Sequence, residues 1–191
     1  TSEFQRVTAD VNAELSDGLA VRVQGLFHDA EVAGRDHVRD DRWGIAPSIA
    51  WGVGTPITAT FSYYHFETDA VPDYGIPLTS RDQLSGGRRE PADVDRSNFY
   101  GLLSRDFQKT KVDSGSFIFR ADLGDGWSLG NTTRFSRARQ NYIVTNPDDS
   151  RGNVANGTVW RNTKSRNSTN ESLVSNVSLG GVFDTFGLGH S

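Results

Sequence analysis

The sequence has 191 residues and a formal net charge of −4, which gives no whole-chain case for nucleic-acid binding. Its mean hydropathy is −0.53, and no stretch approaches the roughly 18 consecutive apolar residues that a transmembrane helix requires. Cysteine is absent, which excludes disulfides, thiolate metal sites and cysteine nucleophiles.

The first two predicted strands, at about 5–15 and 19–28, each have one apolar and one polar face. Successive side chains of a strand point to opposite faces, so strict alternation defines two surfaces. A tight-turn sequence, Ser16-Asp17-Gly18, separates the two strands. The alternating apolar positions are Val7, Ala9, Val11, Ala13 and Leu15 in the first strand and Leu19, Val21, Val23 and Phe27 in the second.

The most clearly two-faced stretch is residues 43–67, which predicts a hairpin of strands at about 43–53 and 57–67. Its turn contains Gly52, Gly54 and Pro56. Trp43 and Trp51 lie near the two ends of one apolar row. Aromatic residues in these positions are typical of membrane-spanning strands, because amphipathic rings prefer the two interfaces.

Three longer strands are predicted in the second half of the chain, at about 106–123, 127–144 and 159–183. Their apolar alternation covers only part of each strand, so the polar halves are expected to extend beyond a membrane. Gly124-Asp125-Gly126 separates the first two of these strands. A turn at 184–187 follows the third, and residues 188–191 predict the start of an eighth strand.

Short and long connections alternate along the whole chain. Short turns are predicted at 16–18, 52–56, 124–126 and 184–187, and long loops at 29–42, 68–105 and 145–157. This order is typical of an up-and-down outer-membrane barrel, which has short turns on one side and long extracellular loops on the other. We therefore predict an all-β, antiparallel transmembrane barrel segment of about seven strands plus the start of an eighth. The alternative is a soluble extracellular β-sandwich, such as a carbohydrate-binding domain, in which the apolar rows would face each other across a dry core.

Five stretches carry a family resemblance, in order along most of the chain. They read RVTADVN, AGRD, RWGIAPSIAWG, SYYHFETDAVPDYGIP and FYGLLSRDFQKTKVDSGSF. Together they resemble the barrel of TonB-dependent siderophore receptors, with the branch for catecholate siderophores as the best match. The resemblance weakens after about Asn141.

The resemblance implies a ferric siderophore transporter of the bacterial outer membrane. Such barrels have about 22 strands around a plugged lumen, so residues 1–191 are expected to be a partial barrel domain that lacks the plug. The implied partners are the ferric siderophore, the protein's own plug domain, the TonB complex acting through an absent N-terminal region, and outer-membrane lipid. Iron enters as cargo inside the siderophore, and no cofactor is implied.

In the family the extracellular loops and the plug capture the ligand. Ferric catecholates are anionic and aromatic, so arginines and aromatic rings are suitable partners. Alternatively, these loop charges are solvated surface paired with nearby carboxylates. The candidate ligand-binding residues are Arg35, Tyr74, Arg81, Arg88, Arg89, Arg96 and Tyr100.

We make a different prediction for the arginines on the polar face of the strands. Arg22 and Arg134 lie opposite the apolar rows, so they are predicted to face the lumen, where they meet the plug or pair with carboxylates such as Asp10.

Enzyme signatures are not found in the sequence. There is no GxSxG motif, and Gly52-x-Gly54 lacks the third glycine and the following helix of a nucleotide-binding loop. The four histidines have no metal-ligand spacing, and the stretch 146–152 lacks the ordered acidic residues of a calcium loop. The sequence therefore predicts a protein that is not an enzyme and has no metal site.

Overall fold

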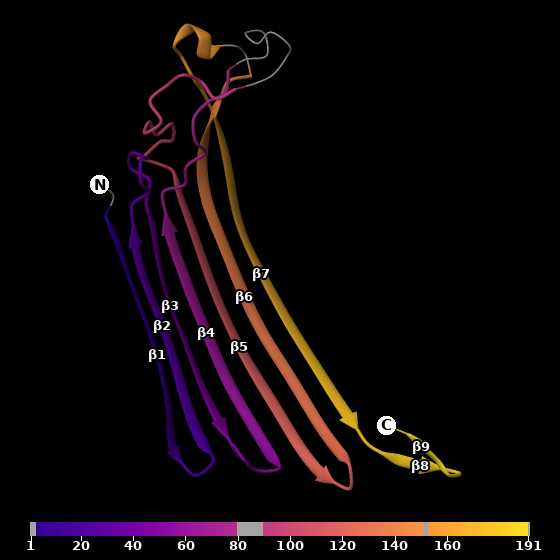
Figure 1. The fold of residues 1–191 in the computed structure, drawn as a ribbon. Coiled ribbons are helices and arrows are strands. Elements are labelled where there is room, and N and C mark those ends of the chain that lie inside the picture. Colours follow the sequence, from indigo (N-terminus) through magenta and orange to yellow (C-terminus); the bar gives the residue numbers. More distant parts are fainter. Residues whose placement is uncertain (1–2, 80–89, 151–152, 191) are drawn as a thin grey trace.

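The computed structural model describes residues 3–79, 90–150 and 153–190, and these form a curved antiparallel sheet one layer thick (Figure 1). Seven strands are paired in the order β1-β2-β3-β4-β5-β6-β7, each next to its neighbour in sequence. The predicted all-β, up-and-down arrangement is thus confirmed. The strands are β1 (Phe4–Ser16), β2 (Leu19–Ala30), β3 (Asp40–Trp51), β4 (Ile57–Ala70), β5 (Phe107–Gly124), β6 (Trp127–Asp148) and β7 (Trp160–Gly180).

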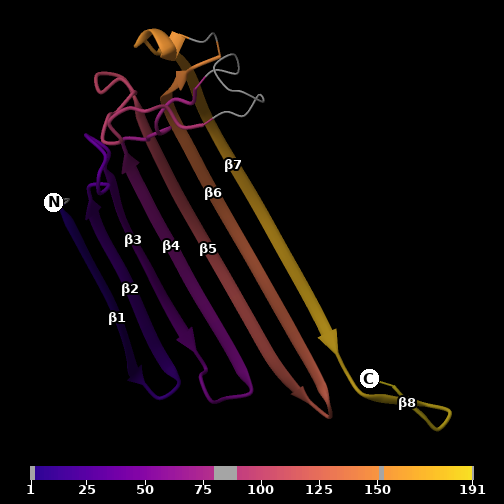
Figure 2. The ribbon, with the colours of Figure 1, turned by 45° about the horizontal axis from the view of Figure 1, so that its top comes forward.

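The long connections gather at one end of the sheet and the short turns at the other (Figures 1 and 2). The only helical element among the described residues is the 3₁₀ turn η2 (Asn153–Asn156), between β6 and β7. No helix in the described part of the chain is long and apolar enough to cross a membrane.

The sheet has almost no conventional core. Among the described residues, the buried apolar side chains are Ala30, Val38, Ala92, Ala121 and Val144, and most of these are small. Large apolar residues in the middle of strands are instead exposed, with Val11 at 63% and Phe61 at 54%. A sandwich would bury such rows against a second sheet, so the single layer disagrees with the β-sandwich alternative.

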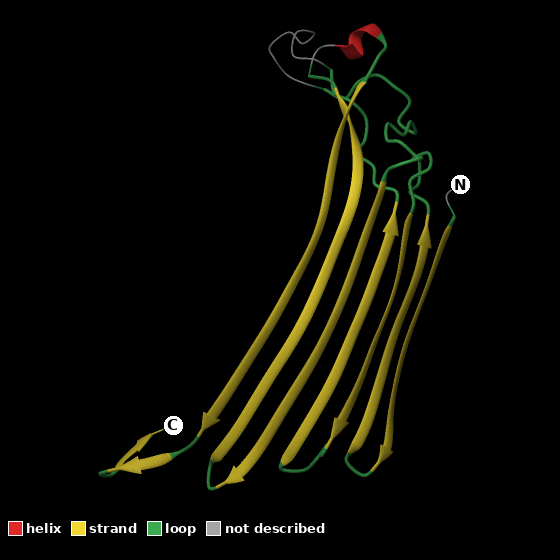
Figure 3. Ribbon diagram, turned by 180° about the vertical axis from the view of Figure 1, so that it is seen from behind, coloured by secondary structure: helices red, strands yellow, loops and turns green. Residues whose placement is uncertain are grey.

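The C-terminal end of the chain differs from the prediction. The strand expected at 159–183 ends at Gly180, and Leu188 does not begin an eighth strand of the main sheet. Instead β8 (Phe183–Thr185) and β9 (Leu188–His190) pair only with each other and bend away from β7 (Figure 3). The departure occurs where the Trp127 indole lies against Gly181, since a Cβ on Gly181 would come within 2.3 Å of the ring.

Several strands also extend further toward the long loops than the sequence predicts. β3 begins at Asp40 and β6 continues to Asp148. The polar residues in these extensions gave no apolar alternation from which to recognise a strand, but they are paired in register with β4 and β7. The connections are correspondingly shorter, at 31–39, 71–106 and 149–159.

Candidate functional site

One face of the sheet carries a continuous apolar belt. Residues paired across antiparallel strands point to the same face, and the register aligns Val21 with Ile49, Ile49 with Phe61, and Phe61 with Phe117. The belt occupies about nine residues of most strands, the length at which tilted strands cross the hydrocarbon layer. Its large members are Val7, Val11, Leu15, Val23, Ile45, Ile49, Trp51, Ile57, Phe61, Phe117, Leu123, Trp127, Phe135, Leu173, Val177 and Leu179.

The upper boundary of the belt runs obliquely across the sheet. The pairing row that contains Phe27 and Trp43 on β2 and β3 continues with Glu67, Lys111 and Arg139 on β4, β5 and β6. Apolar residues therefore reach higher on one side of the sheet than on the other. An oblique boundary is what tilted barrel strands require, because hydrogen-bonded rows then do not lie parallel to the membrane plane.

The opposite face is polar. Arg22 donates to Asp10 through Nε at 2.9 Å and Nη2 at 2.6 Å, which confirms one of the predicted pairs on this face. Arg134 Nε donates to Ser114 Oγ at 2.9 Å. At the level of the belt the two faces thus differ in polarity, as expected for a barrel with lipid outside and a polar lumen inside.

The long loops form one connected cluster through Arg35. This residue lies on the β2–β3 loop and donates to both oxygens of Asp73, at 2.6 and 2.9 Å. A third donor, Nη1, reaches the backbone carbonyl oxygen of Arg96. The two charged side chains are only 14% and 16% exposed. Arg35 therefore joins two parts of the β4–β5 loop that are more than twenty residues apart.

Further contacts extend the cluster toward β7. The backbone N–H of Leu78 donates to Asp149 Oδ2 at 2.6 Å, which links the β4–β5 and β6–β7 loops. Lys164 Nζ on β7 lies 5.3 Å from the centroid of the Tyr74 ring, within the range of a cation–π contact. Tyr74 remains 49% exposed despite this contact.

A buried carboxylate anchors the base of this cluster. Asp106 has a fully buried side chain and accepts hydrogen bonds from Thr145 Oγ1, at 3.0 Å, and from the Leu102 N–H, at 3.1 Å. Arg105 donates to Asp106 and also to the hydroxyls of Thr145 and Thr163. Burial alone would raise the pKa of the Asp106 carboxyl, but the hydrogen bonds outweigh burial and hold that pKa below its usual value.

Asp95 has a smaller role in the same loop. Its carboxylate accepts the backbone N–H of Ser97 at 2.9 Å and the Ser97 hydroxyl at 2.7 Å. These hydrogen bonds lower the pKa of Asp95. The turn that they close lies beside Arg96 and brings Ser97 to the β2–β3 loop, where its carbonyl accepts the Asp36 N–H at 2.8 Å.

The structure places four of the seven candidate ligand residues. Arg35 is engaged in the ion pair with Asp73, whereas Arg96 has an exposed side chain. The Tyr100 hydroxyl accepts a hydrogen bond from Asn98 at 3.4 Å, and Tyr74 lies beneath Lys164. The other three candidates, Arg81, Arg88 and Arg89, lie outside the described residues.

Sequence reasoning missed the partners that arrange these candidates, namely Asp73, Asp149 and Lys164. The DYG bend at Asp73 was a visible signal for local structure, since Asp73 Oδ1 accepts the Gly75 N–H at 2.8 Å. Its ion pair with Arg35 spans 38 positions, and no local pattern indicates such a contact.

Comparison with known proteins shows a match over the entire chain. The chain is 40% identical over 191 residues to a probable TonB-dependent siderophore receptor, PiuA, of Acinetobacter baumannii, covering 100% of this chain and 26% of that protein. It is 34% identical over 200 residues to the catecholate siderophore receptor Fiu of Escherichia coli O157:H7, covering 98% and 26%. No family model matches. The chain thus spans about a quarter of the length of these relatives.

Solved structures give the same result. The crystal structure of the siderophore receptor PiuA from Acinetobacter baumannii superposes with a TM-score of 0.84 at 39% identity, covering 96% of this chain and 26% of that one. The closed form of the ferric-catecholate import receptor Fiu from Escherichia coli K12 gives 0.81 at 31% identity, covering 95% and 27%. These receptors are outer-membrane β-barrel proteins. The chain therefore belongs, as a segment of the barrel region, to the TonB-dependent siderophore receptors.

Proposed function

We propose that this segment is part of a receptor that takes up a ferric siderophore, with catecholates as the first class to test, and that the TonB complex energises the uptake. The observation that carries the proposal is the end-to-end match to siderophore receptors over a sheet with one apolar face, one polar face and long loops at a single end. The iron is cargo inside the siderophore, and the segment has no catalytic role. Its polar face borders the lumen and meets a plug domain.

We place the long loops on the extracellular side, where they take part in capturing the ligand. Arg96 offers an exposed guanidinium, which can bind an anionic catecholate complex through charge-assisted hydrogen bonds. Tyr74 and Tyr100 offer rings for stacking against catechol groups. Arg35 acts indirectly, because its bonds to Asp73 and to the Arg96 carbonyl hold Tyr74 and Arg96 in fixed relative positions. Arg81, Arg88 and Arg89 remain candidate ligand contacts on chemical grounds alone.

The competing binding-module function, a soluble carbohydrate-binding sandwich, has less support. It would require a partner sheet to cover the exposed apolar rows, such as the one containing Val11 and Phe61. The described residues supply no such layer.

The proposal is tested with the complete protein that contains this segment, expressed in a Gram-negative host that lacks its own catecholate receptors. Iron-limited growth is measured with ferric catecholates and, separately, with ferric hydroxamates. We expect growth on at least one catecholate, and slower uptake for an R96A/Y100A double variant. The matched control is R39A, which removes a loop arginine that is paired with Asp41 at 3.0 Å.

Two results would count against the proposal. Absence of uptake of every siderophore, with the barrel folded in the outer membrane, would assign the receptor a different cargo. Fractionation of the complete protein as a soluble species would remove the barrel assignment itself.

A further inference from the structure

Above the apolar belt, and on the same face, the sheet carries a band of charge. We define the charged band as Glu67, Asp69, Lys109, Lys111, Asp113, Arg137, Arg139 and Glu171. The band spans four strands: its cations are on β5 and β6, and most of its carboxylates lie on the neighbouring strands β4 and β7. The band directly adjoins the belt, so in a membrane it lies at the depth of lipid headgroups.

Two cations of the band face each other directly. The register pairs Lys111 on β5 with Arg139 on β6. Like charges in directly opposed positions on an antiparallel pair destabilise the sheet. An anion bound between the two side chains would attract both of them and would make the net electrostatic energy at this position favourable.

The ion pairs of the charged band neutralise the facing cations Lys111 and Arg139 only in part. Lys109 pairs with Asp69 at 2.9 Å, Lys111 with Glu67 at 2.7 Å, and Arg137 with Glu171 at 3.0 Å. Within residues 3–79, 90–150 and 153–190, Arg139 forms no ion pair. Lys111 has three donors and Glu67 uses one of them, so Lys111 retains the capacity to bind a second anion beside Arg139.

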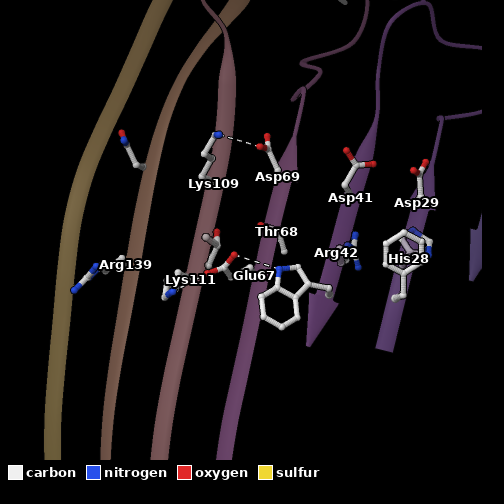
Figure 4. A pocket seen from close by; sticks show the side chains of 14 residues that line it. His28, Asp29, Asp41, Arg42, Glu67, Thr68, Asp69, Lys109, Lys111 and Arg139 are labelled. Atoms are coloured by element: carbon white, nitrogen blue, oxygen red, sulfur yellow. Dashed lines mark hydrogen bonds and ion pairs between the residues drawn. The ribbon is translucent and has the colours of Figure 1, made fainter. Parts of the chain in front are cut away.

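A groove joins these cations to the belt. Its lining includes Phe27 and Trp43 on β2 and β3, and Lys111 and Arg139 lie further along the same pairing row on β5 and β6. Figure 4 shows Lys109, Lys111 and Arg139 on the side of the groove away from His28. The Trp43 indole donates to Glu67 at 3.2 Å, which fixes the ring at the edge of the belt. The groove therefore offers an apolar surface continuous with the belt and a cationic end beyond it.

We propose that the groove binds an anionic, phosphorylated lipid of the outer leaflet, with a phosphate between Lys111 and Arg139 and the apolar part over Trp43 and the belt. Guanidinium and ammonium groups form short charge-assisted hydrogen bonds with phosphate oxygens. Asp29, Asp41, Glu67 and Asp69 also line the groove and repel phosphate, which places the phosphate at the β5–β6 end. The inference rests on the outer-membrane position of the proposed function, but it does not depend on the cargo.

The test uses the complete protein purified in detergent, with bisphosphorylated lipid A as the probe and its dephosphorylated form as the comparison. Binding is measured by native mass spectrometry and by titration. For K111Q/R139Q we expect roughly thirtyfold weaker binding, because each Lys or Arg near a charged membrane surface contributes about a fivefold factor. K111R/R139K keeps both charges and should bind close to wild type.

The matched control is R120Q/R134Q, which removes one arginine from each of the same two strands on the polar face and should retain lipid binding. Heat-modifiable gel migration verifies that each variant is folded. Equal binding by wild type and folded K111Q/R139Q would overturn the proposal. So would equal binding of the phosphorylated and dephosphorylated lipids. Siderophore uptake is measured in parallel, so failure of the cargo assignment and failure of the lipid site give different results.

Discussion

The two ends of the sheet are held together by different forces. At the short-turn end the contacts are between backbones: the Val53 N–H donates to the Gly18 carbonyl at 3.0 Å, and the Asp122 N–H to the Pro56 carbonyl at 2.8 Å. At the long-loop end one contact between loops is also made by the backbone, from the Asp36 N–H to the Ser97 carbonyl at 2.8 Å, but charged side chains add others: the Arg35–Asp73 ion pair and the Asp149 carboxylate that accepts the Leu78 N–H.

This difference indicates what each end tolerates. Backbone turns depend on glycine conformations and respond little to pH or salt. Side-chain ion pairs respond to both, and they allow the loops to vary in sequence without changing the sheet. The loop end can therefore be adapted to a ligand while the turn end preserves the strand register.

The largest expected effect is at the short-turn end, for G52A. Gly52 has a φ of 74°, and an added Cβ would lie 2.0 Å from the Ile57 carbonyl oxygen. The left-handed conformation costs about 1–2 kcal/mol for a non-glycine residue, and overpacking costs about 1–3 kcal/mol more. We expect a loss of about 3 kcal/mol in unfolding free energy, measured by urea denaturation of the complete protein in detergent.

The control for that prediction is G54A in the same turn. Gly54 has a φ of 81° but open space around its Cβ position, so only the conformational cost of about 1–2 kcal/mol applies. If the two variants are equally stable, steric contact with Ile57 does not contribute.

Next in size is R35A at the long-loop end. The substitution leaves the mostly buried Asp73 carboxylate without its bidentate partner, which costs about 2 kcal/mol for an unsatisfied charged group. We expect faster proteolysis within 71–106 and little change in global unfolding. R39A removes an exposed pair instead and should cost less than about 1 kcal/mol. A global loss of stability in R35A would show that the loops and the sheet unfold together.

A pH dependence is expected at Asp106. The folded-state pKa lies below the usual value, so the stabilisation is fully present above about pH 4 and is lost as the pH falls through the lower folded pKa. D106N should destabilise the protein by about 1–2 kcal/mol at pH 7, and the difference from wild type should shrink toward pH 2. The stability difference is measured by thermal unfolding of wild type and D106N between pH 7 and pH 2. A stability difference that does not change with pH would contradict a lowered pKa for Asp106.

The smallest effect is expected for Lys164 and Tyr74. The contact is partly exposed, so the cation–π energy is about 0.5–1 kcal/mol. A double-mutant cycle with K164Q and Y74L should give a coupling energy of that size, and K164R should retain most of it. A coupling energy of zero would mean that Lys164 does not stabilise the position of Tyr74, which would then depend on the Arg35–Asp73 ion pair alone.

The sequence by itself determined the fold class and the main strands. The alternation through Val7–Leu15 and Trp43–Trp51 is visible locally, because side-chain direction in a strand depends only on position parity. The alternation of short and long connections indicated the up-and-down order, which the pairing confirms. The family resemblance was likewise readable from short stretches and is confirmed by the comparisons.

Only the tertiary structure decided which residues far apart in the sequence contact each other. The strand ends at Asp40 and Asp148 are polar and owe their strand conformation to pairing with neighbours. Arg35 was predicted as a ligand contact, but its guanidinium binds an acid 38 positions away. The facing of Lys111 and Arg139 likewise depends on the register between β5 and β6. Local patterns report which face a side chain occupies, whereas partners across strands and loops are fixed only when the whole sheet assembles.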